Sequence, residues 1–175
     1  MRRRVRTDLW ATVVGPLGRG ESATVLAAAA SSAAAVFAST SPRAGAARGA
    51  AIGVVAFDLV GGLVAFQFRP TREKYSASSL RSRLAFALAH VQPFLLPILG
   101  EGSWRRAAAR YATAVIATAA LERCAPRSPC RRLVANSAAA AFSVADLATS
   151  ESRHRWFGPV YLMKVIGGHS GIRRG

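Results

Sequence analysis

Five long stretches of the chain carry few charged side chains. They are residues 22–40, 49–68, 84–99, 104–121 and 132–149, and the charged and turn-forming residues crowd into the segments between them. An α-helix rises 1.5 Å per residue, so about 20 residues are needed to cross the hydrocarbon core of a bilayer, which is about 30 Å thick. The pattern therefore predicts an all-α fold, a polytopic membrane helix bundle of five spans.

Helix ends and a sixth piece follow from the same pattern. Ser41-Pro42 is expected to end the first span, and Pro93 to kink the third, because its nitrogen cannot donate to the Ala89 carbonyl. Residues 156–169 are apolar too, but such a segment rises only about 21 Å, which is short for a crossing. We expect a short C-terminal half-helix there, re-entrant or tilted.

The basic residues predict an orientation. The chain divides into a basic cytoplasmic head (1–21), a transmembrane helical domain (22–170) and a basic tail (171–175). The head, the connector of residues 69–83 and the connector of residues 122–132 together hold 14 Lys and Arg. The three connectors on the opposite side, which contain Arg43, Arg105 and Arg153, hold 6. The positive-inside rule then places the N-terminus in the cytoplasm of a multi-pass cell-membrane protein. Cys124 and Cys130 fall in a cytoplasmic connector, where thiols stay reduced.

Composition qualifies this picture. A net charge of +16 suggests nucleic-acid binding at first sight. Because the charges lie between the apolar stretches and not along helix faces, we expect the lipid bilayer as partner and no nucleic acid. A soluble, alanine-rich basic bundle is the alternative, and a homo-oligomer is left open. Arginine outnumbers lysine 22 to 2, which with the high alanine and glycine content is typical of an actinobacterial genome and makes Lys164 stand out.

Asp58 is the first candidate for chemistry. It stands alone as a charge in the stretch 49–68, and a carboxyl at the middle of a span costs roughly 3 kcal/mol on insertion scales. Gly61 and Gly62 share its helix face and leave room for a neighbouring helix or a substrate. An unpaired Asp58 would be protonated and could act as a general acid, whereas pairing with His90 or Lys164 would keep it charged. The alternative role is a structural anchor between helices.

Further polar residues lie near the same depth or on the last apolar segment. His90 and Gln92 flank the kink at Pro93, and Tyr161, Lys164 and His169 belong to residues 156–169. We predict Asp58, His90 and Lys164 as catalytic residues, and Gly61, Gly62, Gln92, Tyr161 and His169 as substrate-binding residues. A His bonded to a backbone carbonyl and a Lys extending to the surface are the structural alternatives. No spacing indicates a metal site or a cofactor.

Three motifs carry a resemblance. Phe57-Asp58-x-x-Gly61-Gly62, His90-x-x-Pro93-Phe94 and Trp156-Phe157-x-Pro159-x4-Lys164-x4-His169 resemble small, uncharacterised actinobacterial multi-span integral membrane proteins. In shape the chain is also similar to membrane-embedded natural-product biosynthetic enzymes, namely diazo-forming membrane proteins and membrane terpene cyclases.

Two classes of function follow. The first is a membrane-embedded enzyme of small-molecule biosynthesis, with acid-initiated chemistry such as diazotisation or prenyl cyclisation at the midplane Asp/His site. Lys164 and the arginine-rich cytoplasmic rim would hold an anionic group of the substrate. The second is a small transporter or membrane partner subunit, with Asp58 and His90 as a proton relay or an assembly anchor.

Overall fold

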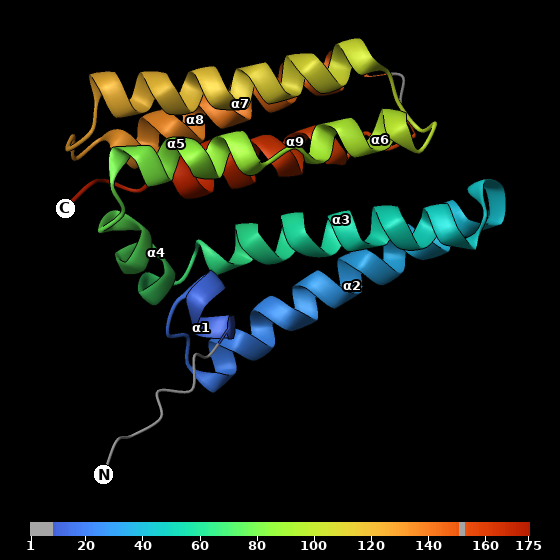
Figure 1. The fold of residues 1–175 in the computed structure, drawn as a ribbon, viewed down its shortest axis with the longest axis horizontal. Coiled ribbons are helices and arrows are strands. Elements are labelled where there is room, and N and C mark those ends of the chain that lie inside the picture. Colours follow the sequence, from blue (N-terminus) through green and yellow to red (C-terminus); the bar gives the residue numbers. More distant parts are fainter. Residues whose placement is uncertain (1–8, 151–152) are drawn as a thin grey trace.

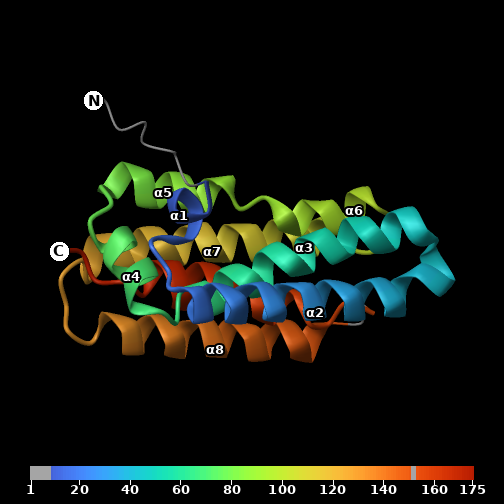
Figure 2. The ribbon, with the colours of Figure 1, turned by 90° about the horizontal axis from the view of Figure 1, so that it is seen from below.

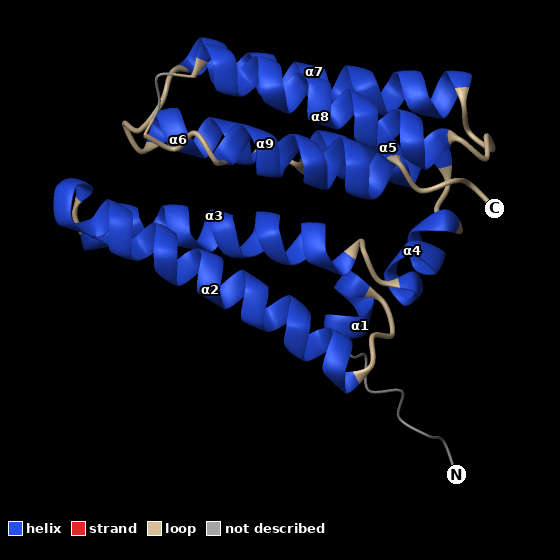
Figure 3. Ribbon diagram, turned by 180° about the vertical axis from the view of Figure 1, so that it is seen from behind, coloured by secondary structure: helices blue, strands red, loops and turns tan. Residues whose placement is uncertain are grey.

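The structure is a computed structural model that describes residues 9–150 and 153–175. Part of the expected basic head, with Arg2, Arg3, Arg4 and Arg6, lies outside the described residues. The described residues form helices, turns and loops, without a strand (Figure 3). The prediction of an all-α fold is confirmed.

The helices follow one another along the chain and mostly run back and forth along one axis (Figures 1 and 2). They are α1 (Leu9–Val14), α2 (Arg19–Ala44), α3 (Ala46–Ala65), α4 (Arg69–Ser76), α5 (Leu80–Ala89), the 3₁₀ turn η1 (Gln92–Phe94), α6 (Leu95–Ile98), α7 (Trp104–Cys124), α8 (Arg131–Thr149), α9 (Phe157–Leu162) and the π-helical η2 (Met163–Ser170). The end of the molecule that holds α4, the α7–α8 loop and the C-terminus is called the basic end here. The opposite end, with the α2–α3 and α6–α7 turns, is the far end.

Two helices, α2 and α3, are long and apolar enough to cross a membrane. A five-span bundle is therefore not confirmed by helix length and composition. The third expected span is divided into α5, η1 and α6, and α7 carries Arg105, Arg106 and Arg110 in its first two turns. These interruptions, and not a loss of helical structure, separate the later helices from the first two.

The segment expected to be a half-helix is the central helix of the fold. The α-helix α9 continues directly into η2, and this segment packs against α3, α5, α7 and α8. Two glycines allow the approach of α8: a Cβ at Gly158 would lie 1.9 Å from Asp146 Oδ2, and one at Gly167 would lie 2.8 Å from Asn136 Oδ1. The apolar residues of 156–169 are thus buried against neighbouring helices, and the expected half-helix is a continuous helical segment from Phe157 to Ser170.

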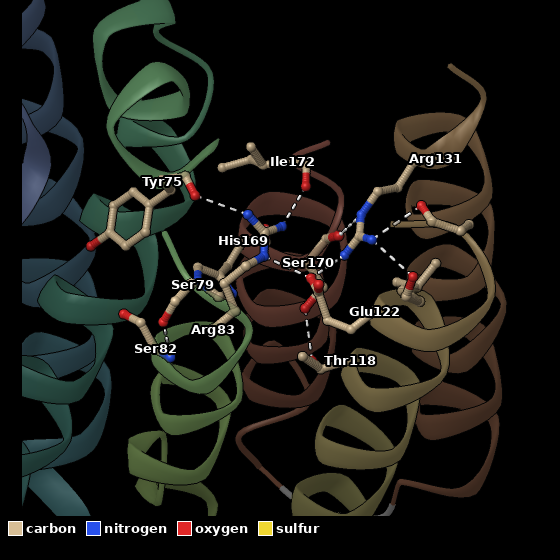
Figure 4. A network of polar contacts seen from close by, with 12 residues as sticks. Tyr75, Ser79, Ser82, Arg83, Thr118, Glu122, Arg131, His169, Ser170 and Ile172 are labelled. Carbon is tan, nitrogen blue, oxygen red and sulfur yellow. Dashed lines mark hydrogen bonds and ion pairs between the residues drawn. The ribbon is translucent and has the colours of Figure 1, made fainter. Parts of the chain in front are cut away.

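A buried ion-pair network holds the basic end of this central helix (Figure 4). Glu122 accepts hydrogen bonds from Arg83 Nε, at 2.6 Å, and from Arg131, and all three side chains are essentially inaccessible. Arg83 also donates to the carbonyl of Ile172, and Arg131 Nε donates to the carbonyl of Ser170 at 2.7 Å. The two arginines therefore satisfy backbone carbonyls that the end of η2 leaves without helical partners.

Acidic residues also fix the far end. Asp146 on α8 accepts two hydrogen bonds from Arg110 on α7, at 2.8 and 2.9 Å, beside the start of α9. Glu101, in the α6–α7 turn, accepts from Arg43 at 2.8 Å, and this bond lowers the pKa of that carboxyl below its usual range. The start of the central helix thus packs against the Arg110–Asp146 pair, with Arg110 over the Phe157 ring, and its other end is bound by the arginines of the Glu122 network.

The α2–α3 hairpin packs through small residues. A Cβ at Gly49 would lie 2.2 Å from Ser41 Oγ, and one at Gly53 would lie 3.1 Å from the Ala33 carbonyl oxygen, so the two backbones come close. The expected stop at Ser41-Pro42 is wrong by a few residues, because α2 continues to Ala44 with Pro42 in its last turn. The helix ends at Gly45, whose φ of 89° favours glycine.

The network around Glu122 yields a test of stability. Glu122→Gln would leave Arg83 and Arg131 buried side by side without an anion, and we expect a loss of about 3–5 kcal/mol of unfolding free energy. The control is Glu73→Gln, which breaks an exposed pair with Arg69 and should cost less than about 1 kcal/mol. Unfolding of both variants in detergent measures the difference, and equal stabilities would contradict the role given to Glu122.

Candidate functional site

A cavity of about 300 Å³ lies where α1, α2, α3, α4 and α5 meet the central helix. Most of its lining side chains are apolar, including Trp10, Phe57, Phe66 and Phe86. Five residues predicted as site residues line it as well: Asp58, Gly61, Gly62, His90 and Lys164. The volume is at the lower end of the range for small-molecule sites, and apolar walls with a few polar groups are typical of such sites.

Asp58 is paired. Its Oδ2 accepts a hydrogen bond from Lys164 Nζ at 2.7 Å and another from Gln92 Nε2 at 2.9 Å. Of the two states expected from the sequence, the structure therefore has the paired one. The Asp58 side chain is 51% exposed and that of Lys164 only 4%, so the carboxylate forms the accessible side of the pair.

The two glycines after Asp58 have different neighbours. A Cβ at Gly62 would lie 2.4 Å from Lys164 Cε, so the missing side chain provides the space for Lys164 to reach Asp58. A Cβ at Gly61 would lie 3.1 Å from Ala29 Cβ, so Gly61 serves the contact of α3 with α2. Gly62 is the more direct determinant of the ion pair.

His90 marks the end of α5, as Pro93 predicts. Without a donor at Pro93, the Ala89 carbonyl accepts from the nitrogen of Val91 instead, and the helix breaks. His90 Nδ1 lies 2.6 Å from the Phe86 carbonyl oxygen. A carbonyl only accepts, so Nδ1 carries a proton, and in the neutral ring Nε2 is the acceptor. No hydrogen bond joins His90 to Asp58 among the described residues; the two share the cavity.

Tyr161 and His169 lie behind the cavity wall. Tyr161 is fully buried, and its hydroxyl donates to the His90 carbonyl oxygen at 3.0 Å, so it positions the helix break. His169 is 1% exposed and stacks on Phe86, with ring centroids 3.8 Å apart, close to Tyr75 (Figure 4). Neither residue lines the cavity, so their predicted contact with a substrate does not fit this geometry.

Sequence reasoning missed the helix that covers one side of the cavity. Trp10 of α1 lines the cavity, and its Nε1 donates to Ser22 Oγ at 3.0 Å. Three side chains of α4 donate to carbonyls at the end of α1: Thr71 to Val14 at 2.5 Å, Tyr75 to Val13 at 3.0 Å, and Lys74 to Thr12. The apolar run of residues 9–14 within the basic head was the available signal for this contact.

Comparisons with known proteins do not assign this chain to a family. Searches against protein-family models, curated proteins and solved structures found no match. The resemblance carried by the three motifs stays a prediction. Within residues 9–150 and 153–175, no three His, Cys, Asp or Glu side chains lie together in a way that could hold a metal ion.

The ion pair gives the prediction for this site. Asp58→Asn should leave Lys164 buried and charged without a partner, and Lys164→Gln should strand the carboxylate. The double variant Asp58→Asn/Lys164→Gln should therefore be more stable than the sum of the single losses, with a coupling of about 1–3 kcal/mol. Unfolding of the wild type and the three variants in detergent measures the coupling, and strictly additive losses would show that the pair contributes nothing.

Proposed function

We propose that the chain is a multi-pass integral membrane protein. The supporting observation is the distribution of side chains on α8. Its buried positions are mostly small, namely Ala135, Ala139 and Ser143, whereas Leu133, Val134, Phe142 and Val144 are exposed. A helix on the surface of a water-soluble bundle shows the opposite arrangement, and lipid-facing helices pack through small residues.

On α7 the same arrangement recurs, since Ile116 is 67% exposed while Ala107, Ala114 and Thr118 are buried. In the membrane, α2, α3, α5 with α6, α7, α8, and α9 with η2 would form six crossings. The crossing by the central helix returns the C-terminus to the basic end, where the N-terminal helix α1 also lies (Figure 1).

The basic residues support a cytoplasmic basic end. Among the described residues this end holds 12 Lys and Arg: Arg19, Arg69, Arg72, Lys74, Arg81, Arg83, Arg123, Arg127, Arg131, Arg132, Arg173 and Arg174. The far end holds seven: Arg43, Arg48, Arg105, Arg106, Arg110, Arg153 and Arg155. The positive-inside rule then gives a cytoplasmic N-terminus and a cytoplasmic α7–α8 loop.

The free thiols of Cys124 and Cys130 test this orientation, because both are exposed at the basic end. A membrane-impermeant maleimide should leave them unlabelled in intact cells and label them after the membrane is opened. The control is Ser103→Cys, in the far-end turn between α6 and α7, combined with Cys124→Ser and Cys130→Ser. This introduced cysteine should be labelled in intact cells. Labelling of the native cysteines in intact cells would reverse the topology.

We propose, as function, a membrane-embedded enzyme of small-molecule biosynthesis that acts on a largely apolar substrate. The observation that carries this proposal is one accessible ion pair, Asp58–Lys164, in the wall of a mostly apolar cavity. An apolar wall strengthens electrostatic interactions at such a pair. No arginine lines the cavity among the described residues, so an anionic substrate group would meet Lys164 and not the arginine-rich rim.

The pairing changes the roles assigned from the sequence. In our proposal Lys164 is the proton donor and the Asp58 carboxylate holds its ammonium group. After each turnover Lys164 regains the proton from the product or from water. His90, with Nε2 as acceptor, is the candidate relay. Diazotisation and prenyl cyclisation both begin with a protonation. An ammonium group is too weak an acid to protonate a carbon–carbon double bond, so of the two reactions this assignment favours diazotisation.

A second candidate is a purely structural role for the pair, as in a transporter or partner subunit. It is favoured by the fact that the Lys164–Asp58 bond joins the α2–α3 hairpin to the central helix. The two candidates differ in one respect. A structural pair can be replaced by two neutral, hydrogen-bonding side chains, and a proton-transfer pair cannot.

The variant Asp58→Asn/Lys164→Gln tests this difference. It should reach wild-type amounts in the membrane but should not form the compound that the wild type adds to the extract of an expressing actinobacterial host, compared by mass spectrometry. The matched control is Arg69→Gln/Glu73→Gln, which removes one exposed pair of the same charges and should retain the compound. Two outcomes would refute the enzyme proposal. Either both variants form the compound, or no strain forms it, the wild type included.

A further inference from the structure

A second cleft, of about 400 Å³, lies at the basic end between α4, the start of α8 and the C-terminal tail. Five arginines line it: Arg69, Arg72, Arg132, Arg173 and Arg174. Glu73 is the one acidic side chain among its described lining residues, and it is already paired with Arg69 at 2.6 Å. Four arginines therefore face this cleft without a carboxylate partner among the described residues.

Two of these arginines are held side by side through Gln67. Arg72 donates to the backbone carbonyl of Gln67, and Arg132 donates to Oε1 of the same residue at 3.1 Å. Burial lowers the pKa of Arg72, and the neighbouring charges of Arg132 and Arg69 lower it further. The fold thus holds like charges together at a site where they repel one another.

Two of the seven arginines at the far end have carboxylate partners. There Arg43 faces Glu101 and Arg110 faces Asp146, each at 2.8 Å. At the basic end, Glu122 neutralises part of the charge of Arg83 and Arg131 in the interior. What distinguishes the cleft is that five arginines line one opening while a single glutamate there is paired with one of them, so an anion from outside can neutralise the others.

Phosphate is the anion that such a cleft fits. Guanidinium groups donate two parallel hydrogen bonds to phosphate oxygens, and several arginines together supply the charge. Ser128 and Pro129, which precede the 19-residue helix α8, line the same cleft, so the positive end of the α8 dipole adds to the field.

A narrow cavity of about 20 Å³ continues from the cleft and shares Arg72 and Arg132 with it. Its other lining residues include Leu63 and Met163, so the charged cleft borders an apolar zone. This cavity has room for about one water molecule, so the cleft itself takes the charged group and a hydrocarbon chain attached to that group would extend outside the cavity.

We propose that this arginine cleft binds a phosphoryl group, supplied by the headgroup of an anionic phospholipid or by free phosphate. The site is separate from the Asp58–Lys164 cavity and does not depend on the proposed enzyme activity. If the basic end is cytoplasmic, the ligand comes from the inner leaflet or the cytoplasm.

The test uses the full chain purified in a neutral detergent. Phosphatidylglycerol, with phosphatidylcholine as the uncharged comparison, and inorganic phosphate, with chloride at equal ionic strength, are titrated in separate arms. A ligand that binds the folded state raises the melting temperature with its concentration. We expect a rise with phosphatidylglycerol, with inorganic phosphate or with both, and the arm that responds identifies the source of the phosphoryl group.

Arg72→Gln/Arg132→Gln should weaken the affinity about 30-fold, at about fivefold per arginine. The control Arg48→Gln/Arg105→Gln removes the same charge from exposed positions at the far end and should bind as the wild type does. Arg173→Gln/Arg174→Gln, in the tail, gives a second cleft variant should the first fail to fold. No shift in either arm, or equal losses in the cleft and control variants, would overturn the proposal.

Discussion

The position of the central helix depends on a carboxylate shared by two buried arginines. Glu122 joins Arg83 of α5 to Arg131 of α8, and the same arginines bind the backbone carbonyls of Ser170 and Ile172. Three buried charges are costly unless each is paired and hydrogen-bonded, and here the carbonyls and the carboxylate supply those partners. The network therefore ties α5, α7 and α8 to the end of η2 at one point.

The Asp58–Lys164 pair follows from that arrangement. Because the central helix is held at the basic end by Glu122 and near the far end by Arg110 and Asp146, Lys164 is brought to the middle of α3. There Gly62 leaves space for its side chain, and the break at His90 opens the neighbouring wall. The site is thus a consequence of how the last helix is fixed, and any variant that loosens its ends should also disturb the pair.

The charged residues follow a pattern that also concerns the two ends of the molecule. The acidic residues at the interior positions each hold arginines or a lysine that bind helix ends or cross between helices, and the remaining arginines gather at the two ends of the molecule. This leaves the middle of the exposed helix faces with few charges, which fits the proposed membrane environment, and leaves arginines without carboxylate partners in the cleft at the basic end. The two proposals therefore rest on different parts of one charge pattern.

Local features could be predicted from the sequence because they depend on neighbours along the chain. Alanine-rich apolar stretches form the helices, and Pro93 breaks α5 at His90. The cost of an isolated charge in an apolar stretch singles out Asp58, and the rarity of lysine in the chain singles out Lys164. Contacts between distant segments could not be predicted in this way. The central place of residues 157–170, the cover formed by α1 and the partners of Arg83, Glu122 and Arg131 join residues that are far apart in sequence. Tyr161 and His169 show the limit most clearly. Their residue types suggested a site, but the packing of the central helix places both side chains in the core behind the cavity wall. The sequence could not decide this, because the face of a helix that is buried depends on the neighbouring helices.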